Sequence, residues 1–116
     1  MQDSILETIK GLLGIISPYG AYDKQIIAMI NTAIMELQQA GVGPSAPFQI
    51  TSNQEIWSDF LTNPVNLSAA INYIHIKVAI MFDQTLSGPT IAAMERQLQE
   101  FIWRLNVAVD PETTFA

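Results

Sequence analysis

The stretch INYIHIKVAIMFD, residues 71–83, decides the fold class of this chain. Its first half alternates apolar and polar residues as a half-buried β-strand does, with His75 and Lys77 as the polar members. The alternation then fails at Ala79, where a run of apolar residues begins. A helical pattern persists for longer, because apolar residues recur at spacings of four and three at positions 67, 71, 74, 78 and 81. We therefore predict a helix over residues 67–83, with Asn66 as its N-cap.

The same predicted helix carries a second apolar row, formed by Ala69, Tyr73, Ile76 and Ile80. On a helical wheel this row lies nearly opposite the first, and Lys77 separates the two on one side. One face can fill the core of a small bundle, while the other needs more of the same chain or another subunit. Charged residues make up only 14% of the sequence, against roughly 25% in a typical soluble protein. This shortage favours a subunit interface for the second row.

Capping patterns predict two helices at the start of the chain. Ser4 and Glu7 form a capping-box pattern before a run of apolar residues at helical spacing, which predicts a short first helix ending near Gly14. Asp23 is expected to be the N-cap of a second helix, which ends at about Ala40.

A loop and a short third helix are expected next. Gly41 suits a left-handed C-cap, and Gly43–Pro44 cannot continue a helix. Ser52 and Glu55 repeat the capping-box pattern, so we expect a short helix after them that ends at Asn63–Pro64.

The last predicted helix covers about residues 89–106, with Pro89 in its first turn. It is strongly amphipathic, because one stripe holds Ile91, Met94, Leu98, Phe101 and Leu105. Trp103 falls well off this stripe. A tryptophan outside the apolar face of a helix is a candidate anchor for a binding partner.

The sequence after this helix predicts an extended C-terminal arm. Val107 and Val109 alternate with other residues, and Pro111 cannot continue the helix. Phe115 is the third large apolar residue of this segment. The expected organisation is a single helical domain over residues 1–106 and an arm over residues 107–116.

Composition excludes several classes of function. The net charge is −6 with only five basic residues, which argues against binding to nucleic-acid phosphates. The sequence holds no cysteine and a single histidine, His75, so disulfides, thiolate chemistry and paired imidazole ligands are excluded. No Glu-x-x-His motif and no phosphate-binding loop occur either. We predict no catalytic, cofactor-binding or metal-binding residues.

The expected environment is soluble and intracellular. No window reaches the ~18 uninterrupted apolar residues of a membrane span. The N-terminal residues include acids where a signal peptide has basic residues.

Taken together, the residue patterns predict an all-α, non-enzymatic protein: a small bundle of about four to five helices that binds copies of itself or other partners. A free-standing helical regulatory or ligand-binding bundle, monomeric or dimeric with an internal pocket, is the alternative.

Several short segments occur in a recognisable order and spacing: Asp23 with Ile26–Ile27 and Ile30–Asn31, Gly41–Pro44, Trp57–Leu61, Tyr73–Val78, Phe82–Asp83, Trp103–Val107 and Val109–Pro111. This set resembles the head–tail connector (adaptor) family of tailed bacteriophages and prophages over about residues 5 to 111. The resemblance implies a small helical subunit that forms a ring, by family analogy a dodecamer, beneath the portal protein.

Such a ring extends the channel through which double-stranded DNA passes without specific binding, and it provides a docking surface for head-completion or tail proteins. The resemblance places the protein at the head–tail interface of the virion, and in the host cytoplasm during assembly, where it joins a capsid that DNA packaging has filled. No membrane or cofactor is implied. The candidates for subunit or partner contacts, taken from the residue pattern, are Ala69, Tyr73, Ile76, Ile80, Trp103, Val107, Val109 and Phe115.

Overall fold

The computed structural model describes residues 3–15, 20–62, 64–83 and 85–109. Within these ranges the chain forms no β-strand. It forms five helices: α1 (Ile5–Leu12), α2 (Asp23–Gln39), α3 (Trp57–Phe60), α4 (Pro64–Phe82) and α5 (Gly88–Val109). The predicted all-α bundle is confirmed, and residues 71–82 are helical.

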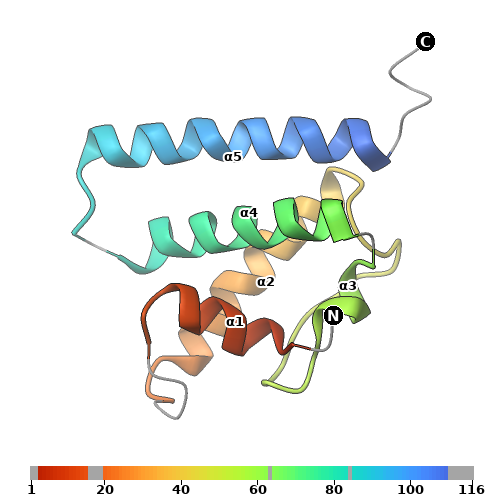
Figure 1. The fold of residues 1–116 in the computed structure, drawn as a ribbon. Helices are drawn as coiled ribbons and strands as arrows, with labels where there is room; N and C mark the ends of the chain where they lie inside the picture. The colour runs from red at the N-terminus through yellow and green to blue at the C-terminus, as the bar shows by residue number, and fades with distance from the viewer. Residues whose placement is uncertain (1–2, 16–19, 63, 84, 110–116) are drawn as a thin grey trace.

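The helix α4 is the centre of the arrangement. It contacts α5 on one side and both α2 and α1 on the other, and α1 also contacts α2. Figure 1 shows α5 running along the length of α4, with α1 and α2 in a layer on the opposite side. Both sides of α4 are therefore covered by other helices of the same chain.

The main core lies between α4 and the layer of α1 and α2. Fully buried side chains from each helix meet there, together with Val42 and Ile50 of the long loop after α2. Each large apolar side chain removed from water in this way stabilises the fold by roughly 1.5–3 kcal/mol. Trp57 brings the short α3 into the core, and its indole N–H donates to the Thr8 hydroxyl at 3.0 Å.

Backbone hydrogen bonds tie the residues just before α1 to the segment just before α3. Ser4 and Ile56 form an isolated antiparallel bridge. The N–H of Ile5 donates to the Glu55 carbonyl at 3.0 Å, and the N–H of Trp57 donates to the Asp3 carbonyl at 3.2 Å. These bonds position α3 against the start of α1.

The helix starts agree with the capping predictions in one case. The Ser4 hydroxyl oxygen accepts a hydrogen bond from the Glu7 N–H at 3.2 Å, so Ser4 is the N-cap of α1 as predicted. The prediction for Asp23 was wrong, because the N-cap of α2 is Tyr22 and Asp23 is its first helical residue. Its carboxylate forms an ion pair instead of a cap. The negative charge still suits the first turn of a helix.

Two further caps were also predicted at the wrong residue. Asn66 lies inside α4, which begins at Pro64, where the fixed φ of proline suits a first turn. The Glu55 carboxylate accepts from the Ser52 N–H at 3.2 Å, but this contact closes a turn before α3. The carboxylate that caps α3 belongs to Asp59, which accepts from the Ile56 N–H at 3.1 Å.

A buried lysine joins α1 to α2. Lys10 is 2% exposed, and its Nζ lies 2.9 Å from Asp23 Oδ1 and 3.7 Å from Glu7 Oε1. The Asp23 oxygen is itself buried and accepts no aligned hydrogen bond from a described residue, so its contact with Lys10 is ionic. A buried cation requires such partners, because desolvation of an unpaired charge is very costly.

The loop after α2 begins with a left-handed glycine, as predicted. Gly41 has φ 91°, its N–H donates to the Gln38 carbonyl, and the Val42 N–H donates to the Leu37 carbonyl at 2.9 Å. This pair of bonds is the Schellman motif, which satisfies the last carbonyls of a helix.

Two amide side chains of α2 hold the rest of that loop in place. Asn31 donates to the Ile50 carbonyl at 3.0 Å and accepts from the Ile50 N–H at 2.8 Å. Gln38 donates to the carbonyls of Pro44 and Ala46 and accepts from the Phe48 N–H. The loop is therefore fixed to α2 although it has no regular structure of its own.

The expected extended arm is wrong over its first residues. The helix α5 continues to Val109, so the backbone of Val107 and Val109 is helical, and only their backbone is described. The proline that was expected to end the helix lies at position 111, which leaves the preceding residues free to complete another turn. The rest of the predicted arm, residues 110–116 with Phe115, lies outside the described residues.

Candidate assembly surfaces

The second apolar row of α4 is covered to different extents. Tyr73 is buried, with 5% of its surface exposed. Ala69, Ile76 and Ile80 are half-buried and pack against the core of their own chain. The structure therefore brings the row together on one helix and places part of its area inside the subunit. Contact of the remaining area with a neighbouring subunit stays a prediction.

A polar cluster lies at the centre of this row. The Tyr73 hydroxyl donates to Glu36 Oε1 at 3.2 Å, and Lys77 Nζ lies 3.4 Å from Glu36 Oε2. Burial, and after it the charge and hydrogen bond of Glu36, raise the pKa of the Tyr73 phenol. The phenol therefore stays protonated and acts as a donor that fastens α4 to α2.

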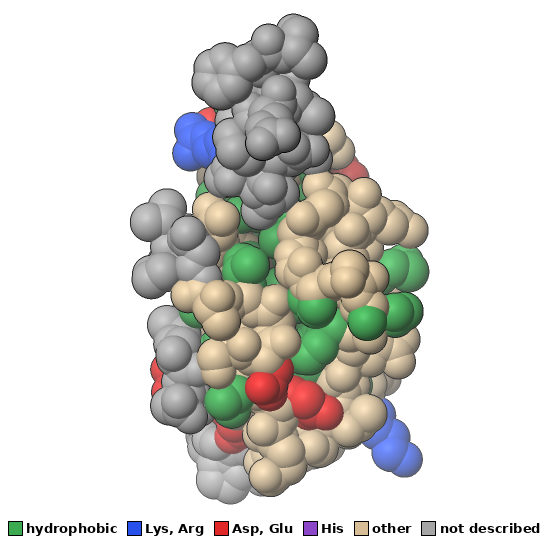
Figure 2. Space-filling view, turned by 90° about the vertical axis from the view of Figure 1, so that its right-hand side faces the viewer, with side chains coloured by type: hydrophobic (Ala, Val, Ile, Leu, Met, Phe, Trp, Pro, Cys, Tyr) green, Lys and Arg blue, Asp and Glu red, His purple; other side chains and the backbone are tan. Residues whose placement is uncertain are grey.

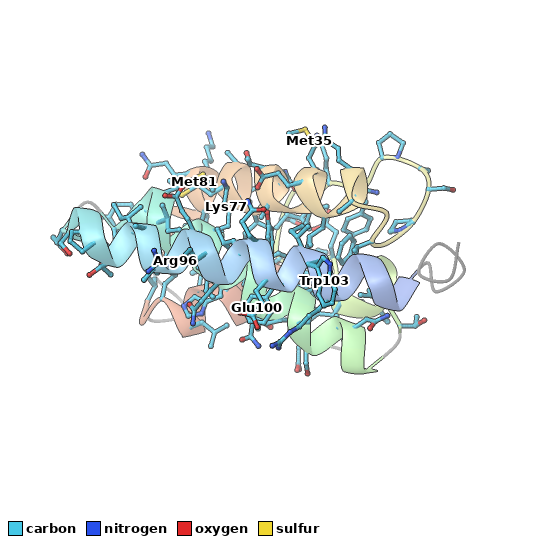
Figure 3. The ribbon with its side chains drawn as sticks, turned by 90° about the horizontal axis from the view of Figure 1, so that it is seen from above. Met35, Lys77, Met81, Arg96, Glu100 and Trp103 are labelled. Carbon is cyan, nitrogen blue, oxygen red and sulfur yellow. The ribbon has the colours of Figure 1, made fainter. Side chains whose placement is uncertain are left out.

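Trp103 is the most exposed large apolar side chain of the described residues, at 65%. It lies on the face of α5 that points away from α4, as predicted from its place off the apolar stripe (Figure 3). Arg104 and Glu100 form an exposed ion pair beside it. Arg96 is exposed one heptad earlier and has no ion pair with a described residue.

A surface groove of about 960 Å³ lies where the end of α1, the first half of α2 and the end of α4 meet. Its described lining is mainly apolar: Leu12, Leu13, Ile15, Tyr22, Gln25, Ala28, Met29, His75, Ala79, Met81, Phe82, Asp83 and Thr85. The rings of Tyr22 and Phe82 meet edge to face with centroids 5.4 Å apart. Leu12 and Tyr22 remain 47% and 42% exposed, so water still covers much of their apolar area. An open apolar surface of this kind is typical of a binding site.

The titratable groups of the groove are few. Burial lowers the pKa of His75, and a hydrogen bond to the Leu12 backbone partly opposes that effect. A neutral imidazole at pH 7 is compatible with an apolar lining. Hydrogen bonds from the side chain and backbone of Thr85 lower the pKa of Asp83, so the groove carries a carboxylate at its exposed edge.

Met35 forms a second, smaller apolar projection on the outer side of α2. It is 51% exposed and lies between two shallow hollows of about 430 and 460 Å³, which the long loop borders. Figure 3 shows Met35 on the side of the molecule away from Glu100 and Trp103.

Charge is sparse on the surface as well as in the sequence. Figure 2 shows an end of the molecule where acidic side chains lie near the middle and Lys or Arg side chains lie only at the edges. Among the described residues, no group of three or more metal-binding side chains is close enough to hold an ion. None of the described helices has the length and apolar character needed to cross a membrane.

The groove, Met35 and buried Lys10 were not predicted from the sequence. The groove is formed by three segments that are far apart in the chain, and the spacing of residues within one helix does not predict which helices pack together. The sequence contains one signal for the burial of Lys10. The residue lies next to Ile9 on a short apolar helix, and Glu7 one turn earlier is a possible ion-pair partner.

Comparison with known proteins gives one result. A family model described as phage connector protein matches residues 5–112, which is nearly the whole chain. No curated protein and no solved structure gives a significant match.

Proposed function

The chain belongs to the phage connector protein family, and from this premise we propose that it is the head–tail connector subunit of a tailed phage or prophage. In this role several copies form a ring beneath the portal protein, by family analogy a dodecamer. The ring lengthens the DNA channel and provides the surface on which head-completion or tail proteins dock. The protein acts as a structural component of the virion and not as an enzyme.

The observation that carries this proposal is the extent of the family match, which includes every described helix. Two physical features support it. Trp103 and the groove between α1, α2 and α4 expose apolar area that a partner can cover. The acidic, sparsely charged surface suits a channel through which DNA must move without being held.

Native mass spectrometry tests the assembly. The purified chain is measured alone and mixed with the portal protein of the same phage or prophage. We expect a discrete species containing many copies of this chain on the portal oligomer. A chain that remains a monomer or dimer in the presence of the portal contradicts the proposal and favours a free-standing helical regulator or ligand-binding bundle.

The proposed channel role predicts very weak binding to duplex DNA. Lys and Arg number only five, and Lys10 and Lys77 already form ion pairs within the chain, so few counterions can be released on binding. We expect a dissociation constant weaker than about 10⁻⁴ M near physiological salt. Fluorescence anisotropy with a labelled duplex measures it. Tight binding that weakens steeply with added salt is the result that excludes a passive channel wall.

A further inference from the structure

Trp103 and the groove lie toward opposite ends of the molecule. The groove is bordered by Asp83 and Thr85, just before α5 begins at Gly88. Trp103 is fifteen residues further along α5, and a helix rises about 1.5 Å per residue, so it lies roughly 22 Å from the start of α5. Figure 3 shows Trp103 well apart from Met81, which lines the groove. The tryptophan therefore cannot fill the groove of its own chain.

The groove is large enough for an indole, and its mainly apolar lining suits one. Its lining includes leucine, isoleucine, two methionines, a tyrosine and a phenylalanine, and methionine side chains adapt easily to the shape of a ligand. A volume of about 960 Å³ exceeds one side chain, so the groove has space for Trp103 and neighbouring atoms of the helix that carries it. Tryptophan is among the residues that contribute most binding energy when they enter such a pocket.

The charged residue near Trp103 and the one at the edge of the groove have opposite signs. Arg96 lies two helical turns before Trp103 on the same exposed side of α5, with no ion pair to a described residue. Asp83 is exposed at the edge of the groove, and the hydrogen bonds from Thr85 favour its charged form. A copy whose Trp103 enters the groove presents Arg96 on the same face as a guanidinium that can pair with this carboxylate.

We propose that Trp103 of one copy docks in the groove formed by α1, α2 and α4 of the next copy. The contact is heterologous, because one copy supplies the exposed face of α5 and the other supplies the groove. Repeated contacts of this kind close into a ring when the rotation between copies allows it. The inference rests on the proposed function, and it adds which two surfaces of the chain meet in that assembly.

Disulfide trapping tests the contact directly, because the sequence holds no cysteine. Gln99→Cys places a thiol on the exposed side of α5 one turn before Trp103, and Gln25→Cys places one at the groove. The two variants carry tags of different mass and are mixed at high concentration under mild oxidation. We expect the mixed disulfide to exceed both symmetric ones. Gln54→Cys, which is equally an exposed glutamine but lies on the turn before α3, replaces Gln25→Cys as the matched control.

Trp103→Ala in the Gln99→Cys chain separates a specific contact from chance collision. Tryptophans at the centre of an interface contribute much of its binding energy, so the yield of mixed disulfide is expected to fall at least about tenfold, which corresponds to about 1.4 kcal/mol. Because Trp103 is largely exposed, the thermal unfolding of the variant should remain close to that of the parent chain.

Three results overturn the inference: an equal yield with Gln54→Cys, an unchanged yield with Trp103→Ala, or a predominance of symmetric Gln99→Cys dimers. The last of these indicates an isologous contact. A ring on the portal without the mixed disulfide rejects these surfaces while leaving the proposed function in place. A mixed disulfide that depends on Trp103, without any ring on the portal, supports the contact and rejects the connector role.

Discussion

Replacing Lys10 by methionine is expected to lower the free energy of unfolding by about 3 kcal/mol. Methionine has a similar length, so the packing around position 10 is largely kept, but the buried Asp23 oxygen loses the cation that lies 2.9 Å away. Breaking a buried pair on one side costs about 3–5 kcal/mol in other proteins. We expect the lower end of that range, because the Asp23 and Glu7 side chains keep 35% and 31% of their surface exposed and can rehydrate.

Lys24→Met is the matched control, since Lys24 is exposed on the same helix as Asp23. A change at an exposed site of this kind usually alters stability by less than about 0.5 kcal/mol. Urea unfolding of both variants, followed by circular dichroism, measures the difference. Adding Asp23→Asn to Lys10→Met should recover part of the loss, because the amide carries no charge to desolvate. Equal midpoints for Lys10→Met and Lys24→Met are incompatible with a stabilising ion pair.

Replacing Gly43 by alanine is expected to lower the free energy of unfolding by a similar amount, about 3 kcal/mol. Backbone strain and a steric clash both contribute to this loss. Gly43 has φ 93°, where an L side chain is strained. A Cβ at this position would lie 2.6 Å from Cε1 of Phe60, which is too close for a carbon–carbon contact. Phe60 is 3% exposed and meets Phe48 with ring centroids 5.5 Å apart, so it has little freedom to move aside.

Gly14→Ala separates the backbone strain from the steric clash. Gly14 also has a left-handed backbone, with φ 82°, but a Cβ there meets nothing within 4 Å. Only the backbone penalty applies, and about 1 kcal/mol is expected. Thermal unfolding of the two variants gives the contribution of the Phe60 contact as the difference. If both variants lose the same stability, then Phe60 shifts without cost and the loop tolerates a side chain.

The helices could be predicted from the sequence because each has a local signal. Apolar spacing over several turns identified α4 in spite of its strand-like first half, and the stripe on α5 was equally clear. The starts of helices were less predictable. Asp23 has the residue type of an N-cap, yet its carboxylate pairs with Lys10 of another helix, and no pattern within α2 reveals that partner.

The surfaces were only partly predictable. The exposure of Trp103 followed from its angle on a single helix, which local sequence determines. The sequence showed that α4 has two apolar faces but not what covers them, and the structure places α5 along one side and α1 and α2 along the other. The groove depends on how three helices meet, so it became visible only with the tertiary structure.

The position of α5 also has a consequence for how the subunit opens. This helix packs chiefly against α4, whereas α1, α2 and α4 support one another through a shared core. Detaching α5 therefore breaks one packing surface and leaves the rest folded, so its free energy of opening is lower than that of global unfolding. Amide hydrogens of α5 should exchange with solvent before those of α2 and α4. An outer helix that opens on its own can also be exchanged between identical subunits, so α5 is the element through which domain swapping would occur.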